Sequence, residues 1–239
     1  MERLRNAARR RAVQTDAQRA LVLLSGGQDS TTCLWWALER FGPENVQAIS
    51  FDYGQRHRIE LESAVAVAAL ARVPQVCLPI DTFAALGGDA LTDAAIEVGE
   101  NTKRGDGLPN TFVPGRNLVF LTYAAAWAWR RRIRNLVTGV AQTDYSGYPD
   151  CRASTLAALE ETLRLGMETD VEIHAPLMYL SKRETVELAA ALGALDAMAL
   201  THTCYNASRP PCGYCPACRL RAKGFAEAGV PDPLLARAS

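Results

Sequence analysis

The hydrophobic residues of this chain fall into short, largely apolar runs separated by longer stretches with a helical period. Five runs have the length of buried strands: residues 20–24, 46–54, 73–80, 136–140 and 171–174. The stretches around them predict helices that begin near residue 28, span 60–71, end near 132, span 153–165 and span 181–192. Ser181 and Glu184 have the spacing of a capping box, and Gly193 ends that helix. This alternation predicts an α/β protein with a doubly wound, parallel, five-stranded sheet.

The first predicted strand runs into a glycine turn and then a helix start, at residues 25–30. Gly26 and Gly27 let the backbone approach a phosphate closely, and the first free N–H groups of a helix favour an anion. No lysine follows the glycines, which excludes a Walker loop, and the spacing excludes a dinucleotide fingerprint. An ordinary glycine turn capped by Asp29 or Ser30 is the alternative. The segment resembles the Ser-Gly-Gly-x-Asp-Ser loop of ATP pyrophosphatases, which cleave ATP between its α- and β-phosphates.

That resemblance implies an adenine nucleotide alpha hydrolase-like, Rossmann-like fold that uses ATP with Mg²⁺. It implies catalytic roles for Ser25, Asp29 and Ser30 in stabilising charge on the phosphates. The residues expected to bind the nucleotide and its metal are Leu24, Ser25, Gly26, Gly27, Gln28, Asp29, Ser30, Thr31, Thr32, Cys33, Leu34 and Asp52.

Four of the seven cysteines lie close together near the end of the chain, at Cys204, Cys212, Cys215 and Cys218. With no secretion signal in the sequence, such clustering favours a metal over disulfides. Four thiolates would hold one structural Zn²⁺ and leave no position for water. An iron–sulfur cluster is the alternative. Cys33 and Cys77 are expected to be small core residues.

Length and charge then divide the chain into three expected parts. Its 239 residues carry a formal net charge of +0, so the net charge indicates neither nucleic acid nor a membrane surface as a partner. We expect a disordered, Arg-rich leader at 1–19, an ATP-pyrophosphatase α/β domain at 20–195 and a helical zinc-binding subdomain at 196–239. The leader has no apolar centre, so a cytoplasmic protein is expected. No apolar run approaches the ~20 residues of a membrane span.

Several segments together resemble the 7-cyano-7-deazaguanine synthase family of the queuosine pathway: residues 25–34, 51–57, 109–117, 143–152 and 204–206. The resemblance covers about residues 20–230. It implies an ATP-dependent carbon–nitrogen ligase that converts 7-carboxy-7-deazaguanine and ammonia to the nitrile through adenylated acid and amide intermediates, releasing AMP and pyrophosphate. No cysteine outside the cluster resembles an amidotransferase nucleophile, so free ammonium is the expected nitrogen source. The family also suggests a homodimer.

Roles for individual residues of the substrate site follow from the same resemblance. Arg116 would hold the substrate carboxylate or the α-phosphate, because a guanidinium matches both. Tyr148 would stack on the base, and Asp150 would accept hydrogen bonds from its guanine-like edge. Asn117 and Arg152 complete the expected substrate-binding set. For each of these residues an ordinary loop hydrogen bond is the alternative.

Three other functions remain open from the sequence. One is another ATP pyrophosphatase, such as a tRNA-modifying ligase, although such enzymes usually carry an added RNA-binding domain or a catalytic cysteine pair. The second is a zinc-knuckle module that binds nucleic acid. Such a module requires a basic face around the cysteines. The third is a defence-system relative that applies the same chemistry to a protein partner.

Overall fold

The computed structural model describes residues 18–55, 59–87, 90–91, 108–142, 148–206 and 208–236. Some sequence predictions lie outside these residues and are not addressed by the structure. They concern the leader up to residue 17, most of the insertion at 81–110, and two parts of the family resemblance, residues 56–57 and 143–147.

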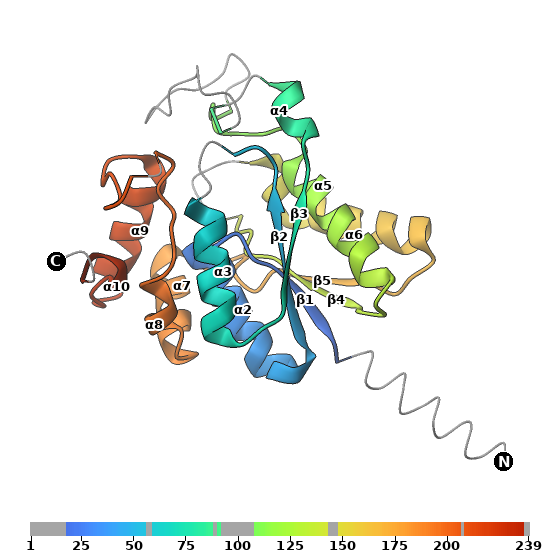
Figure 1. Cartoon of the computed structure of the whole chain (residues 1–239), viewed down its shortest axis with the longest axis horizontal. Coiled ribbons are helices and arrows are strands. Elements are labelled where there is room, and N and C mark those ends of the chain that lie inside the picture. Colours follow the sequence, from blue (N-terminus) through green and yellow to red (C-terminus); the bar gives the residue numbers. More distant parts are fainter. Residues whose placement is uncertain are drawn as a thin grey trace.

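The described residues form one five-stranded sheet in which all neighbouring strands are parallel. Its order is β3-β2-β1-β4-β5, with β1 in the centre (Figure 1). The strands are β1 (Ala20–Leu23), β2 (Val46–Asp52), β3 (Gln75–Pro79), β4 (Asn135–Val137) and β5 (Glu172–His174). The predicted doubly wound α/β fold is therefore confirmed, although each strand is shorter than its apolar run.

Helices cover both faces of this sheet. In Figure 1, α2 (Gln28–Phe41) and α3 (Ile59–Ala71) cover one face, while α5 (Arg116–Trp129) and α6 (Ala153–Met167) cover the other. Helices α7 (Lys182–Ala191), α8 (Leu195–Met198), α9 (Pro216–Glu227) and α10 (Pro233–Ala236) lie outside α2 and α3. The remaining short elements are α4 (Thr82–Leu86), η1 (Pro43–Asn45) and η2 (Pro149–Cys151).

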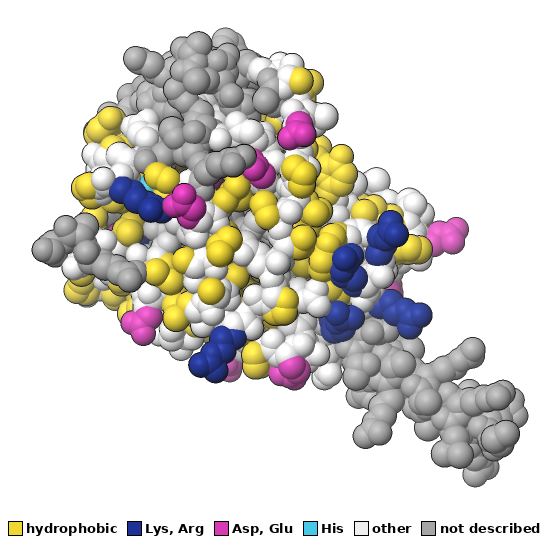
Figure 2. Space-filling view, in the orientation of Figure 1, with side chains coloured by type: hydrophobic (Ala, Val, Ile, Leu, Met, Phe, Trp, Pro, Cys, Tyr) yellow, Lys and Arg dark blue, Asp and Glu magenta, His cyan; other side chains and the backbone are white. Residues whose placement is uncertain are grey.

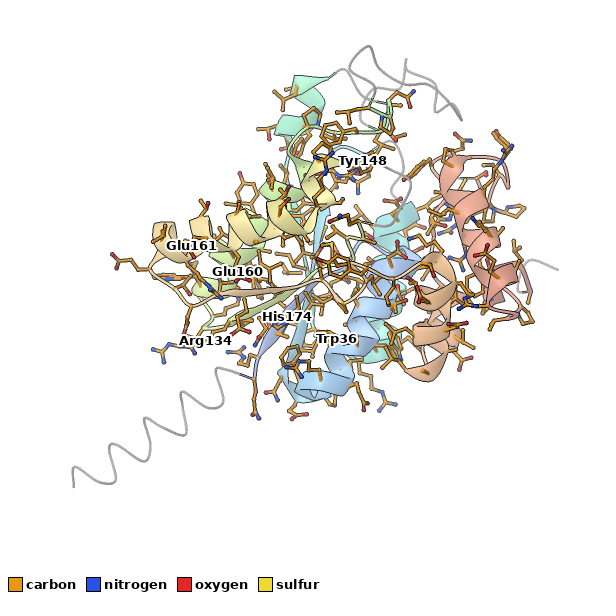
Figure 3. The ribbon with its side chains drawn as sticks, turned by 180° about the vertical axis from the view of Figure 1, so that it is seen from behind. Trp36, Arg134, Tyr148, Glu160, Glu161 and His174 are labelled. Carbon is orange, nitrogen blue, oxygen red and sulfur yellow. The ribbon has the colours of Figure 1, made fainter. Side chains whose placement is uncertain are left out.

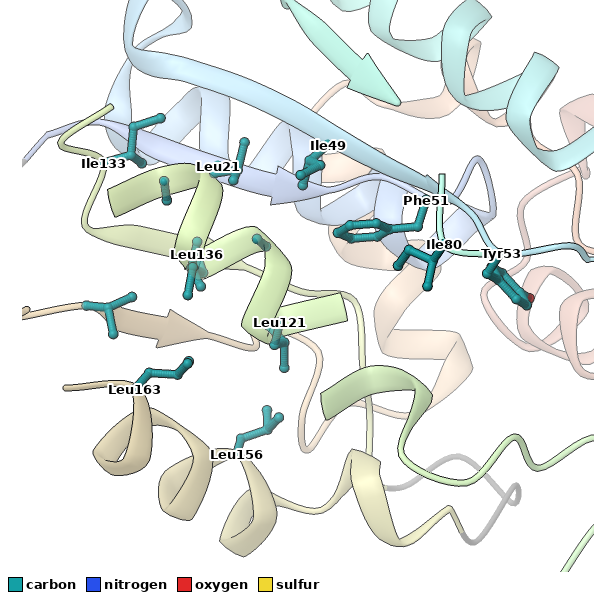
Figure 4. Close-up of a cluster of buried hydrophobic side chains, with 14 of the residues drawn as sticks. Leu21, Ile49, Phe51, Tyr53, Ile80, Leu121, Ile133, Leu136, Leu156 and Leu163 are labelled. Carbon is teal, nitrogen blue, oxygen red and sulfur yellow. The ribbon is translucent and has the colours of Figure 1, made fainter. Parts of the chain in front are cut away.

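The central strand contributes to two hydrophobic cores because successive side chains of a strand point to opposite faces. Leu21 packs with Leu121 of α5 and Leu156 of α6 in the core shown in Figure 4. Its neighbour Val22 packs instead with Leu34 of α2 on the opposite face. Burial on both faces explains why β1 is continuously apolar rather than alternating.

Strand β3 corrects one prediction from the sequence. Cys33 is fully buried, as expected, but Cys77 is exposed. The reason is that β3 is an edge strand of the sheet, next to β2 alone. An apolar run in an edge strand does not imply burial of every residue in it.

The C-terminal helices are joined to the body by polar contacts as well as by packing. Ser181 and Glu184 form the predicted capping box at the start of α7, which packs against α9. The guanidinium of Arg221, only 4% exposed, forms a two-pronged ion pair with Asp232 at 2.7 Å and donates to the Thr201 hydroxyl at 2.7 Å. These bonds tie α9 to the segments on either side of it. No helix in the described part of the chain is long and apolar enough to cross a membrane.

Candidate active site and metal centre

A cavity of about 340 Å³ opens where the strand order reverses. Strand β2 lies on one side of β1, and β4 lies on the other. The connections that leave the carboxyl ends of β1 and β4 therefore run in opposite directions and leave a crevice between them. Ligands bind at such switch points in open α/β sheets. Leu24 after β1, Phe51 in β2 and Gly139 after β4 all line the cavity. The topology therefore places the loop after β1 at the expected binding crevice.

Residues 25–30, the phosphate loop, are ordered by their own hydrogen bonds. The Ser30 hydroxyl donates to the Gly27 carbonyl at 3.1 Å and accepts from the Ser25 N–H at 3.2 Å. The two serine hydroxyls lie 3.0 Å apart. Helix α2 begins at Gln28 with no side-chain cap, so its first N–H groups remain available to an anion. Leu24, Ser25 and residues 27–30 line the cavity.

Two glycines allow the backbone around this loop to pack more closely than a side chain would permit. Gly26 has φ +89°, and a Cβ there would lie 2.1 Å from the Glu60 carbonyl oxygen of α3. A Cβ on Gly139 would lie 2.9 Å from the Ser30 nitrogen. The loop is thus held by backbone from α3 and from the end of β4. Gly26 does not line the cavity because it faces α3.

A lysine does reach the loop, but from a distant part of the sequence. Lys182, the first residue of α7, donates to the Asp29 carboxylate at 2.6 Å. Its side chain is 8% exposed, and both residues line the cavity. Sequence reasoning missed Lys182. The helix dipole disfavours a basic residue in the first turn of a helix. The unfavourable position of Lys182 in the predicted helix was therefore the one hint in the sequence that this residue has another role.

The other part of the cavity carries the predicted substrate residues. Arg116 begins α5 and donates to the Tyr53 hydroxyl at 3.3 Å. The Tyr148 hydroxyl shares a hydrogen bond of 2.6 Å with Thr111, and burial raises its pKa. Arg116, Asn117 and Tyr148 all line the cavity. Figure 3 shows Tyr148 well away from Arg134 and His174.

Other predicted site residues lie beside the cavity rather than on its surface. Asp150 is buried and accepts the backbone N–H of Asn117 at 3.1 Å, which orients the start of α5. Arg152 is exposed, and neither it nor Asp52 lines the cavity. The predicted nucleotide residues at 31–34 lie inside α2, where they are buried. The roles of these residues stay predictions from the sequence.

Glu60 and Tyr205 also line the cavity, and the sequence analysis assigned neither of them a role in the site, although Tyr205 lies in one of the segments that carry the family resemblance. Glu60 lies in the first turn of α3. Burial, partly offset by the positive charge of Arg116, raises the pKa of Glu60 to about 7. Burial likewise raises the pKa of the Tyr205 hydroxyl. Nothing in the local sequence around either residue indicates that it faces the crevice.

The four C-terminal cysteines, here called the cysteine cluster, converge on one point. The sulfur atoms of Cys204, Cys212, Cys215 and Cys218 all lie within 4.8 Å of one another. The sulfurs of Cys212 and Cys218 are 3.9 Å apart. Sulfurs ~2.3 Å from one tetrahedral ion would be separated by similar distances. Cys204 also lines the cavity, so the cluster borders the site.

The surroundings of the cysteine cluster suit thiolates. Backbone N–H groups of Cys212 and Cys215 donate to the sulfurs of Cys204 and Cys212, each at 3.4 Å. Burial opposes ionisation of Cys204, but hydrogen bonds from Cys212, Ser208 and Asn206 lower its pKa to about 6. Burial raises the pKa of Cys215 and Cys218, and a bound cation would reverse that effect. The cluster is compatible with a structural metal site.

Comparison with known proteins gives a consistent result. A family model described as queuosine biosynthesis protein QueC matches residues 19–229. The chain is 68% identical to a protein of Chromobacterium violaceum over 94% of this chain and 96% of the relative. It is 64% identical to a protein of Laribacter hongkongensis over 93% and 96%. A Bradyrhizobium protein is 52% identical over 87% and 93%. All three relatives carry the name 7-cyano-7-deazaguanine synthase.

Proposed function

The chain belongs to the QueC family of queuosine biosynthesis proteins, and from this premise we propose that it is a 7-cyano-7-deazaguanine synthase. It joins ammonium to 7-carboxy-7-deazaguanine and converts the resulting amide to the nitrile, with ATP cleaved to AMP and pyrophosphate at each activation. The observation that supports this most directly is the meeting of the phosphate loop and Arg116 in one cavity. One part of that cavity suits phosphates, and the other offers a guanidinium to a carboxylate.

The chemistry explains why both parts are needed. A carboxylate is a poor electrophile because its leaving group would be oxide, so adenylation replaces that group with AMP. Arg116 would hold the substrate carboxylate near the α-phosphate as the new C–O–P linkage forms. The phosphate loop and Lys182 would stabilise the charge that develops on the departing pyrophosphate. The amide oxygen would leave as AMP by the same steps.

Two metals belong to the proposal with different roles. Mg²⁺ would accompany ATP and neutralise its phosphates, with Asp29 as the nearest carboxylate of the phosphate loop. Zn²⁺ would be held by the cysteine cluster, where four thiolates give a closed tetrahedral site that is structural rather than catalytic. Its function would be to order the segment of Cys204 and Tyr205, which borders the cavity.

The remaining partners are small molecules and a second copy of the chain. Formal net charge is +0, and basic side chains on the face shown in Figure 2 are interspersed with acidic ones apart from one small group. This distribution supports a small-molecule substrate rather than tRNA itself. The exposed apolar residues Val65 and Leu70, both on α3, would suit the interface of a homodimer. Sedimentation would measure the oligomeric state, and a gel shift with tRNA would measure nucleic-acid binding.

The decisive experiment supplies the protein with ATP, Mg²⁺, ammonium and 7-carboxy-7-deazaguanine and identifies the products by mass spectrometry. We expect the nitrile, AMP and pyrophosphate. Omitting ammonium should prevent amide formation, whereas supplying the amide should remove the need for ammonium. Formation of ADP instead of AMP, or no nitrile from either substrate, would contradict the proposal.

A further inference from the structure

The nitrogen that enters the product poses a problem of proton removal. Ammonium has no free electron pair and cannot attack an adenylated acid until it loses a proton. The nitrile nitrogen carries no hydrogen at all, so every proton on the incoming nitrogen must leave during the two activations. A cavity that carries out this chemistry needs a base close to the reacting carbon.

The cavity offers two carboxylates among the described residues that line it, Asp29 and Glu60. The Asp29 carboxylate accepts a hydrogen bond from the ammonium group of Lys182 at 2.6 Å, so this carboxylate already has a cationic partner. Glu60 forms no ion pair with any lysine or arginine of the described chain. Its carboxylate is therefore the one better placed to accept a proton.

The position of Glu60 is fixed by backbone packing. Its carbonyl oxygen would lie 2.1 Å from a Cβ on Gly26, so the first turn of α3 rests directly on the phosphate loop. The guanidinium of Arg116, which also lines the cavity, lies within electrostatic range of the Glu60 carboxylate. Glu60 is thus beside the two groups that would hold the ends of the adenylated intermediate.

We infer that the Glu60 carboxylate is the base that removes protons from the nitrogen introduced by this enzyme, an assignment that rests on the proposed function. Ammonium gives a proton to Glu60, its electron pair forms the C–N bond, and the C–O bond to AMP breaks with its electrons leaving on AMP. The attached nitrogen loses a second proton to give the amide. When the amide oxygen has become bonded to AMP, the last two N–H protons leave as that C–O bond breaks and C≡N forms.

All four protons leave the same nitrogen, so a single carboxylate that passes each proton to solvent serves both half-reactions. Among the residues that the structure describes, the charged and titratable groups around Glu60 are Arg116 of α5 and, in the segment before α9, Cys204 and Tyr205. Burial raises the pKa of Glu60 to about 7, which suits a base that must both accept and release protons near neutral pH.

The test compares Glu60→Gln with Glu62→Gln. Glu62 lies in the same turn of α3 but is 63% exposed and paired with Arg209 at 3.0 Å, which makes it a matched control. Glu60→Gln should lower kcat/KM for ammonium by about 10²–10⁴-fold. Conversion of supplied amide to nitrile should fall as well, since it also needs the base. Exchange of labelled pyrophosphate into ATP, measured with the acid substrate and no ammonium, should be unchanged because adenylation involves no nitrogen.

A pH series separates a base from a merely structural residue. Free ammonia makes up more of the ammonium pool as pH rises, so the deficit of Glu60→Gln in amide formation should shrink at high pH. Normal activity of this variant, an equal loss of pyrophosphate exchange, or a deficit independent of pH would overturn the assignment. Glu60→Asp, with a shorter carboxylate, should recover part of the activity. A wild-type protein with neither exchange nor nitrile formation would instead overturn the proposed function, and this inference with it.

Discussion

The phosphate loop and the cysteine cluster border the same cavity but are held in place by different means. The loop lies between α3 and the end of β4, where Gly26 and Gly139 bring backbone against backbone. The cluster lies in the segment before α9 and in the first turn of that helix, where its order depends on four sulfurs meeting within 4.8 Å. The loop should therefore keep its shape without any ligand, whereas the cluster should depend on its metal. Separate perturbation of the two regions tests this difference.

Removing one sulfur should give the largest effect. Cys215→Ser should lose its metal by elemental analysis, because structural zinc supplies about 10–16 kcal/mol of apparent binding free energy in small zinc-dependent folds. Limited proteolysis should then cut between about residues 200 and 216, while the α/β body stays resistant. Activity should fall because Cys204 and Tyr205 line the cavity.

The exposed Cys77 provides the matched control, since Cys77→Ser should retain metal and activity. Stoichiometric zinc in Cys215→Ser would contradict a four-thiolate site. Iron with visible absorbance in the native protein would identify an iron–sulfur cluster instead.

Breaking the loop requires a change in its backbone packing. Gly26→Ala should lower the free energy of unfolding by about 3 kcal/mol or more, because a left-handed conformation and a contact with the Glu60 carbonyl oppose the new Cβ together. Gly193→Ala isolates the first cause, since Gly193 has φ +73° and a methyl group added there would meet no neighbour within 4 Å. That control should cost only about 1 kcal/mol. Equal losses in urea denaturation would show that the close approach at Gly26 contributes nothing.

The phosphate loop and the cysteine cluster were largely predictable because the residues of each lie close together in the sequence. The phosphate loop occupies six consecutive positions between an apolar run and a helical period. The cysteine cluster falls within fifteen positions of the chain, and its spacing alone limits the geometry. The three inner strands, β1, β2 and β4, were predictable because burial on both faces favours continuous apolar runs.

Contacts between distant segments were not predictable in this way. Lys182 and Asp29 are separated by 153 positions, and no local pattern connects them. Glu60 reaches the cavity only because α3 packs on the loop, and Cys77 is exposed only because β3 lies at the edge of the sheet. Each of these features depends on the order of strands in space, which periodicity does not specify.

A third change tests the chemistry of the loop without altering its backbone. Lys182→Met should lower kcat/KM for ATP by about 100-fold, or ~3 kcal/mol, if its ammonium group stabilises charge on the pyrophosphate. Arg183→Met, in the same turn of α7 but 53% exposed and paired with Glu187, is the control and should be nearly neutral. Steady-state kinetics at varied ATP would measure both variants. Equal turnover by both would remove Lys182 from the reaction.

The smallest expected effect concerns the helix that carries this lysine. Ser181→Ala removes the side chain that accepts the Glu184 N–H and should cost about 1 kcal/mol of unfolding free energy. Glu187→Gln, on the exposed side of the same helix, should change little. A fall in ATP turnover for Ser181→Ala without loss of metal would show that α7 belongs with the phosphate loop rather than with the cysteine cluster. Simultaneous loss of metal would place it with the cluster.

The ion pair between Arg221 and Asp232 has a practical consequence for anyone who shortens the protein. A chain cut before residue 232 would keep the buried guanidinium but lose the carboxylate that neutralises it, and an uncompensated buried charge typically costs about 3–5 kcal/mol. Arg221 also lines the cavity, so the damage would reach the active site. Affinity tags and fusion partners should therefore be joined beyond α10, and a trimmed protein that aggregates should not be taken as evidence that the α/β body is unstable.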